Sequence, residues 1–336
     1  MKGSYLNRNL AIDTLRGIAI VLMILSNFTG EHLLLPHPML LRILGSFAPP
    51  IFIVLCGFML GLSKEKKQAG FGYFLKRSAI VVCVALGVDV LIWREIPFLS
   101  VDVLHLIGVG ILFVYFFLKL PRFLQWVVVF GMLFLTPYLQ PQLGFIAVPT
   151  FIEFACLTPL PSFQILLNHW IVDGGFPLFP WLSCLFFGAI LVPLKDLYDG
   201  LKGDKKLGVI AGVFSLFVVA CMSWILNPVA QRIRDNYSEL FYPPTFGFVV
   251  SMMLMVVLGV LVLEPVAHRR WFSPFRILGR HSLLLYVVHL VLIVYVMPEK
   301  QKLPLSLFLC VYIFLMFAIW MGLYIKEVLR KGPSAP

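Results

Sequence analysis

Charged side chains begin an otherwise apolar stretch near the start of the chain. The segment "IDTLRGIAIVLMILSN" (12–27) carries Asp13 and Arg16 three residues apart, on one face of a helix, and ends on Asn27. A charge at a bilayer centre costs about 2.5–3.5 kcal/mol on insertion scales, whereas an arginine near the membrane surface extends its guanidinium into water. The pair is therefore either an interfacial ion pair or the mouth of a site for an anionic ligand.

Two histidines follow this stretch, in "GEHLLLPHPML", at positions 32 and 37. A neutral imidazole can act as a general base or as a nucleophile, and the amide of Asn27 is suited to donate a hydrogen bond to an oxyanion. Interfacial histidines are more often packing residues or polar anchors. The presence of two histidines, His32 and His37, beside an asparagine at a helix end nevertheless favours a catalytic role.

A second group of polar residues lies late in the chain, in "FRILGRHSLLLYVVHLVLI" (275–293). Arg276 and Arg280 are expected at the inner mouth of a helix, and Tyr286 and His289 lie three apart inside it. A histidine within a membrane span is a site hypothesis by default, although a neighbouring helix can also satisfy it.

The remaining polar pairs do not form a compact ligand set. Asp102 and His105 share one helix face, with Arg94 as another partner for Asp102, and His169 and Asp173 lie four apart in a long loop. Because a metal site needs several ligands that converge, these scattered pairs predict no metal.

Composition places these residues in a membrane. The 336 residues are 60% hydrophobic and 13% charged, with a mean hydropathy of +0.96, against about 25% charged in soluble domains. We expect an all-α polytopic membrane protein, a single domain over residues 1–336, with short interfacial helices on the outer face within 141–178. Apolar stretches near the bilayer-spanning length predict about ten transmembrane helices, at 11–30, 44–63, 78–96, 101–119, 124–140, 179–194, 207–226, 246–263, 282–297 and 304–325.

The basic residues set the expected orientation. With the N-terminus inside, 21 of the 27 lysines and arginines fall in inner segments, and the other six are Arg42, Arg94, Arg232, Arg234, Lys300 and Lys302. This asymmetry follows the positive-inside rule and predicts that both termini are cytoplasmic. The net charge of +11 is thus topological, with some attraction for anionic membrane lipid, and does not indicate nucleic-acid binding.

Four segments carry a resemblance to a known family. The chain resembles the catalytic membrane domain of heparan-α-glucosaminide N-acetyltransferase and its bacterial relatives, among the transmembrane acyltransferases. The similar segments are, in order, "IDTLRGIAIVLMILSNF", "FPLFPWLSCLFFGAIL", "YPPTFGFVVSMMLM" (242–255) and "LGRHSLLLYVVHL".

The resemblance implies acetyl transfer from cytosolic acetyl-CoA, as co-substrate, to an amino sugar or another glycan or lipid acceptor on the extracytoplasmic face, in a bacterial inner membrane. Asn27 matches the family's helix-end asparagine. His37 fits the family's histidine best by distance, and His32 stays an alternative. N- and O-acetylation, direct transfer and an acetyl-histidine intermediate, and a monomer and a homodimer all stay open.

The resemblance also implies a cytosolic site for the phosphates of coenzyme A, because arginine binds phosphate with a bidentate fork. The residues assigned to donor binding are Arg16, Asp13, Lys76, Arg77, Arg276, Arg280, Tyr286 and His289. Two other functions are compatible with the sequence. A transporter or flippase would move its substrate without consuming acetyl-CoA, and a non-catalytic subunit that keeps the fold would not bind acetyl-CoA.

Overall fold

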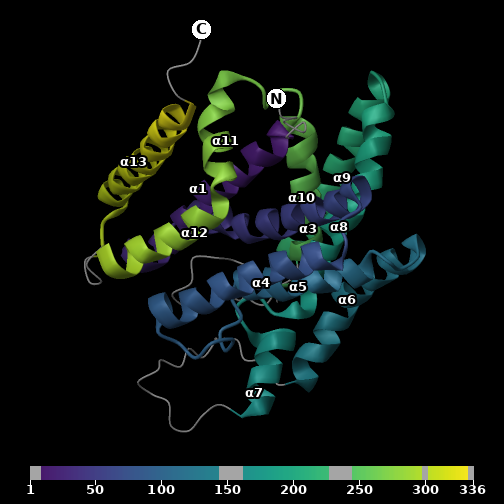
Figure 1. Cartoon of the computed structure of the whole chain (residues 1–336), viewed down its shortest axis with the longest axis horizontal. Helices are drawn as coiled ribbons and strands as arrows, with labels where there is room; N and C mark the ends of the chain where they lie inside the picture. The colour runs from purple at the N-terminus through teal and green to yellow at the C-terminus, as the bar shows by residue number, and fades with distance from the viewer. Residues whose placement is uncertain (1–8, 144–161, 227–243, 297–301, 332–336) are drawn as a thin grey trace. The chain divides into compact units, whose positions relative to one another are not determined.

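The structure is a computed structural model that describes residues 9–143, 162–226, 244–296 and 302–331, and in these ranges it is helical. Apart from an isolated bridge between Leu33 and Leu303, the described ranges contain no β pairing, so the expected all-α class is confirmed. The elements are α1 (Leu10–His32), α2 (Met39–Ser46), α3 (Ala48–Lys67), α4 (Phe71–Val88), η1 (Asp89–Trp93), α5 (Val103–Phe117), α6 (Arg122–Gln142), α7 (Phe163–Asn168), η3 (His169–Asp173), α8 (Leu178–Gly200), α9 (Asp204–Leu226), α10 (Phe246–Leu263), η5 (Arg270–Phe272), α11 (Ser273–Arg280), α12 (Ser282–Val291), η6 (Leu292–Val296) and α13 (Leu305–Lys331) (Figure 1).

Seven of the described helices are long and apolar enough to cross a membrane: α1, α2 with α3, α6, α8, α9, α10 and α13. The pair Arg270–Arg280 and Ser282–Val296 is bent by 73° and adds an eighth if it forms one broken span. An integral membrane protein is thus confirmed, whereas the expected count of about ten spans is not.

The difference in count has a local cause. The expected span over 101–119 is α5, whose 15 residues fall short of the roughly 20 that cross a bilayer. The expected span over 78–96 ends early, since α4 gives way to the π-helical turn η1 at Asp89, and Arg94 takes a left-handed conformation with φ 56°. The range in which interfacial helices were expected contains the short helices α7 and η3, and its residues 144–161 lie outside the described part.

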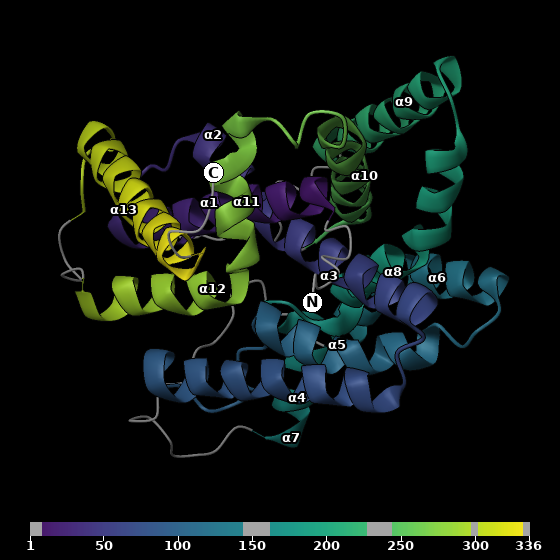
Figure 2. The same ribbon diagram turned by 45° about the horizontal axis from the view of Figure 1, so that its top comes forward.

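The chain forms two compact units. The first contains residues 1–48, 236–240 and 258–336, and the second contains residues 49–235 and 241–257. In the first unit α1 packs closely on α11, which Figure 2 shows meeting α12 at the bend. A Cβ atom on Gly17 would lie 1.8 Å from the carbonyl oxygen of Phe275, and one on Gly279 would lie 2.0 Å from that of Asp13. Small residues permit this backbone contact between membrane helices, and it brings α11 against the first turns of α1.

In the second unit, glycines also allow close backbone contact, here between α3 and α8. Gly57 and Gly61 are one turn apart on α3, and a Cβ on either would clash with a carbonyl oxygen of α8 at 1.9 or 2.2 Å. Gly188 on α8 makes the same kind of close contact with α3, because a Cβ on Gly188 would lie 2.0 Å from the carbonyl oxygen of Val54. In the same unit α4 and α5 lie side by side (Figure 1), joined where the Ser78 hydroxyl donates to the Gly108 carbonyl at 2.7 Å.

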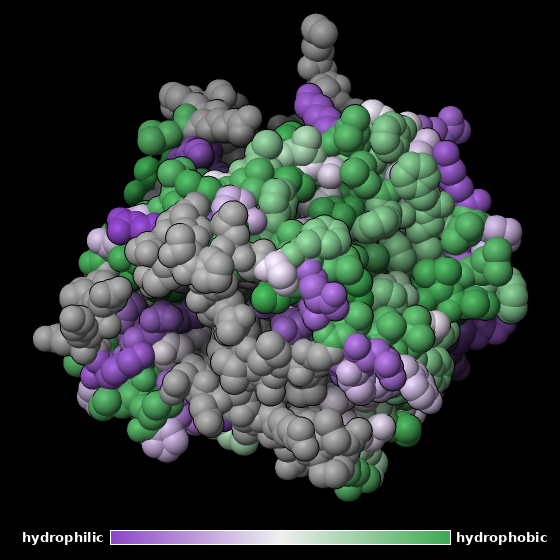
Figure 3. Space-filling view, turned by 90° about the horizontal axis from the view of Figure 1, so that it is seen from below, coloured by the Kyte–Doolittle hydropathy of each residue, from purple (hydrophilic) through white to green (hydrophobic). Residues whose placement is uncertain are grey.

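Apolar side chains cover much of the outside of these helices. Only 6% of the apolar window of α9 and 17% of that of α13 is buried within the protein, and Figure 3 shows many hydrophobic side chains on the surface, with hydrophilic residues in separate groups between them. Leaving so much apolar area in water is unfavourable, so lipid is the environment in which these faces are stable.

Candidate functional site

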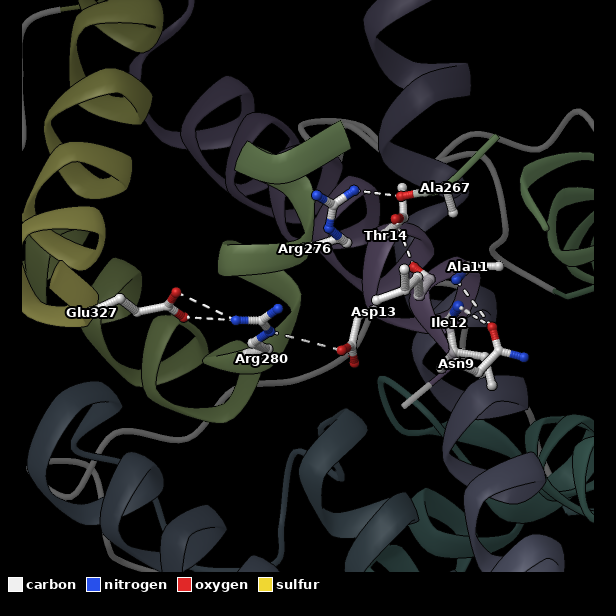
Figure 4. Close-up of polar contacts among 10 residues, drawn as sticks. Asn9, Ala11, Ile12, Asp13, Thr14, Ala267, Arg276, Arg280 and Glu327 are labelled. Carbon is white, nitrogen blue, oxygen red and sulfur yellow. Dashed lines mark hydrogen bonds and ion pairs between the residues drawn. The ribbon is translucent and has the colours of Figure 1, made fainter. Parts of the chain in front are cut away.

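Charged residues meet at the start of α1 in the first unit (Figure 4). Asn9 caps the helix with its side chain. One turn later, Oδ2 of Asp13 lies 3.9 Å from Nε of Arg280 on α11, and Nη1 of Arg280 donates to both carboxylate oxygens of Glu327, at 3.2 and 3.3 Å. Arg280 therefore connects three helices. Glu327 is part of this cluster and was not singled out from the sequence.

Arg276 has backbone partners. Its Nη1 donates to the carbonyl oxygen of Ala267 and, at 3.0 Å, to that of Arg269, which fixes the connection between α10 and α11 (Figure 4). Arg16 is half-buried on α1, three residues beyond Asp13. A phosphate group that bound Arg280 would have to compete with Glu327 and Asp13.

Lys76 and Arg77 belong to α4, in the second unit, and both are exposed. The Arg77 guanidinium donates to the hydroxyl of Tyr73 at 2.7 Å and lies over its ring, 5.4 Å from the centroid. The Tyr73 hydroxyl is in turn 3.1 Å from that of Ser63. The Arg77 side chain is thus held against α4 and α3 by neutral groups that leave its charge available to an anion.

The polar contact at the other end of α1 joins two residues that the sequence analysis had assigned to different roles. Nδ2 of Asn27 lies 2.7 Å from Nε2 of His289 on α12. His289 is completely buried, and Asn27 is half-buried. The two residues are 262 positions apart in the chain, and the packing of α12 on α1 brings them together.

The second ring nitrogen fixes the tautomer of His289. Nδ1 lies 3.0 Å from the carbonyl oxygen of Leu285, one turn earlier, and a carbonyl can only accept, so Nδ1 carries the proton. Nε2 then offers its lone pair to the Asn27 amide. The imidazole thereby orients Asn27, leaving the amide's second N–H and its carbonyl oxygen for other partners. Tyr286 packs against His289, with the ring centroids 5.5 Å apart.

The segment that carries His32 and His37 is tied to the chain between η6 and α13. Leu303 donates its N–H to the His32 carbonyl at 2.8 Å, and its own carbonyl accepts from Leu34 at 3.1 Å. The ammonium of Lys302 donates to the carbonyls at the end of α1. The segment from His32 to His37 therefore has a defined position at the end of α1.

The two histidines differ in their surroundings. His32 is 4% exposed and packs on Phe28, with the ring centroids 5.5 Å apart. His37 is half-buried, and its Nε2 lies 3.3 Å from the carbonyl oxygen of Leu33. His37 is thus the more accessible of the two to a molecule that approaches from outside the protein.

A buried Asp–His pair in the second unit was not predicted from the sequence. Asp89 and His105 are 0% and 1% exposed, and Oδ2 of Asp89 lies 3.0 Å from Nε2 of His105. The same Oδ2 accepts the N–H of Phe98 at 3.1 Å, and Nδ1 of His105 accepts the N–H of Asp102 in a capping box at the start of α5. Asp102 was expected to pair with Arg94 or His105. The sequence signal for Asp89 was a carboxylate inside an apolar stretch.

Replacing Asp89 with alanine is expected to destabilise the second unit by about 2–5 kcal/mol, because it leaves the Phe98 N–H without its acceptor and removes the carboxylate 3.0 Å from the buried His105 ring. Thermal or denaturant unfolding in detergent measures this. Asp199→Ala is the matched control, since it removes an exposed carboxylate paired with Lys195 and should cost no more than about 1 kcal/mol. Equal effects of the two substitutions would show that the buried pair is not a stabilising contact.

Within the described residues, no group of three or more histidine, cysteine, aspartate or glutamate side chains comes together as metal ligands do. The charged cluster lies at one end of α1 and the Asn27–His289 pair lies near the other.

Comparison with known proteins identifies the family of the chain. No curated protein matches the chain. The sequence model of the family described as "Heparan-alpha-glucosaminide N-acetyltransferase, catalytic" matches residues 8–223, which is more than half of the chain. The matched range contains Arg16, Asn27, His32 and His37, while His289 lies beyond it. The chain belongs to the heparan-alpha-glucosaminide N-acetyltransferase catalytic-domain family.

Proposed function

We propose that the protein transfers an acetyl group from cytosolic acetyl-CoA to an amine or hydroxyl of a glycan or lipid-linked acceptor on the extracytoplasmic face. Membership of a membrane acetyltransferase family supports a transferase. The observation that carries the proposal is the 2.7 Å contact between Asn27 and the buried His289. A fixed amide at a helix end, beside a segment with two histidines, provides the groups that acyl transfer requires.

In the proposed reaction, His37 takes the proton of the acceptor as its nitrogen or oxygen attacks the thioester carbonyl carbon. The carbonyl oxygen becomes an oxyanion, to which the Asn27 amide donates a hydrogen bond. The C–S bond then breaks, and the coenzyme A sulfur leaves with the proton carried by the imidazolium. His289 does not need to touch the substrates in this scheme, because its role is to orient Asn27.

The donor is proposed to enter at the opposite end of α1. Arg16 and Asn27 are eleven residues apart, which is roughly 16 Å along a helix at 1.5 Å per residue. Phosphates held at Arg16 would leave the pantetheine arm to extend towards Asn27. The distribution of basic residues supports a cytoplasmic location for this end and for both termini, and the membrane is proposed to be a bacterial inner membrane.

The proposed function is tested by incubating the purified protein with acetyl-CoA and candidate amino sugars, glycans or lipid-linked saccharides. Release of free coenzyme A together with an acetylated acceptor is the expected result. A protein reconstituted in vesicles that moved a saccharide without consuming acetyl-CoA would instead be a transporter, and the proposal would be wrong.

Arg16→Ala is expected to weaken acetyl-CoA binding about ten-fold or more, because a charge-assisted hydrogen bond to phosphate contributes about 1.5–3 kcal/mol. Calorimetry with the detergent-solubilised protein measures the change. Arg42→Ala is the control, since it removes the same charge from α2 in the same unit. Unchanged affinity in a folded Arg16→Ala protein would make Arg16 a structural residue.

A further inference from the structure

Two lysines from different elements of the second unit converge on one aromatic ring. The ammonium nitrogen of Lys64, on α3, lies 4.7 Å from the centroid of the Tyr115 ring, and that of Lys119, just after α5, lies 4.6 Å from the same centroid. Lys119 also lies 5.6 Å from the centroid of Phe116. Cation–π attraction holds each lysine in place, but it does not neutralise the two charges.

Neighbouring cations in this unit do have carboxylate partners. Lys66 pairs with Asp196 and Arg122 pairs with Glu65. Within the described part of the chain, neither Lys64 nor Lys119 contacts a carboxylate. Both lysines make cation–π contacts with aromatic rings. Two ammonium groups gathered on one ring repel each other. An anion bound by both would remove this repulsion, which neither the ring nor any carboxylate of the described residues does.

The surroundings of the two lysines are apolar and exposed. Phe71 and Phe74, on α4, pack against Tyr115 with ring centroids 5.3 Å away, and Phe71 also lies 6.0 Å from Phe116. Phe71 is 41% exposed and Phe116 is 55% exposed. Aromatic rings beside ammonium groups are typical of the boundary between lipid acyl chains and headgroups.

We propose that Lys64, Lys119 and the Tyr115 ring form a binding site for the phosphate of an anionic phospholipid. The lysines would contact the phosphate, and the exposed faces of Phe71 and Phe116 would contact the upper part of an acyl chain. A soluble phosphate compound would meet the lysines equally well but would gain nothing from these exposed rings, which is why a lipid is the favoured ligand. This site is independent of the proposed acetyl transfer, so either can fail without the other.

Phosphatidylglycerol binding to the purified full chain tests the site. We expect Lys64→Gln/Lys119→Gln to weaken binding, measured by native mass spectrometry or titration in detergent, by about five-fold for each lysine. Lys64→Arg/Lys119→Arg keeps both charges and should retain binding. Lys66→Gln is the matched control, because it removes one charge two residues from Lys64 that is already paired with Asp196. It should change binding at most about two-fold.

Three results would overturn the proposal. An equal loss in the Lys66→Gln control would mean that the surface charge acts diffusely and that no site exists. Displacement of phosphatidylglycerol by coenzyme A or by inorganic phosphate at similar concentrations would assign the lysines to a soluble phosphate. Equal affinity of the unaltered protein for phosphatidylcholine would show that the net negative charge of the lipid is not recognised.

Discussion

His37→Ala is expected to reduce acetyl transfer about 10²–10⁴-fold, the usual loss when a general base is removed, while acetyl-CoA binding changes little. The acceptor lies on the outer side in the proposed mechanism, so its proton has to be taken there. His37 lies in the segment that follows α1, and its side chain is half-buried. Turnover with a fixed acceptor, measured beside calorimetric binding of acetyl-CoA, separates the chemical step from donor binding.

His32→Ala is the matched comparison, because it deletes the same side chain five residues earlier. The His32 ring is buried against Phe28, so its removal is expected to lower stability more than turnover. An inactive His32→Ala protein beside an active His37→Ala protein would transfer the role of base to His32. Normal turnover in both would exclude the outer histidines and make His289 or His169 the next candidate.

Each half of the Asn27–His289 contact could be predicted from the sequence, but the contact itself could not. A polar side chain inside an apolar helix stands out, since it is expensive in a membrane. Which partner satisfies it depends on packing between helices separated by most of the chain. From the sequence, His289 is predicted to help bind acetyl-CoA. In the structure its Nε2 lies 2.7 Å from Nδ2 of Asn27.

The helical membrane architecture follows from composition, but the number of spans depends on where helices stop. Residues 101–119 are as apolar as a span, yet α5 covers only Val103–Phe117. One reason lies at its start, where Asp102 caps the helix and Nε2 of His105 lies 3.0 Å from Oδ2 of Asp89. Asp89 itself sits in a π-helical turn that ends α4. Hydropathy averaged over a window does not detect such local interactions.

The partners of Arg276 and Arg280 could not be predicted from the sequence. Arg276 and Arg280 are four residues apart and were given the same role in binding phosphate. In the structure Arg276 donates to two backbone carbonyls, and Arg280 pairs with Glu327 and Asp13 (Figure 4). A sequence shows that a cation is present, but whether its partners are nearby backbone carbonyls, as for Arg276, or carboxylates of other helices, as for Arg280, is seen only in the fold.

Asn27→Ala is expected to reduce turnover about 10²–10³-fold, the typical loss for one oxyanion donor, with the KM for acetyl-CoA nearly unchanged. The amide donates to a charge that exists only in the transition state, so its removal lowers kcat and spares ground-state binding. Asn27→Asp is the complementary variant. Its carboxylate has nearly the same shape but repels the oxyanion, so it should be no more active than the alanine variant.

His289→Phe should lower kcat by less than Asn27→Ala, because it releases the Asn27 side chain without deleting it. His289→Gln, which can still accept from the amide, should retain more activity than His289→Phe. The decisive comparison is the double variant Asn27→Ala/His289→Phe. If His289 acts only by orienting Asn27, the double variant will be no slower than Asn27→Ala alone, since coupled residues do not add. If the double variant instead lost activity by the product of the two single losses, and its KM for acetyl-CoA rose, His289 would contact the donor. This is the role that was predicted for His289 from the sequence.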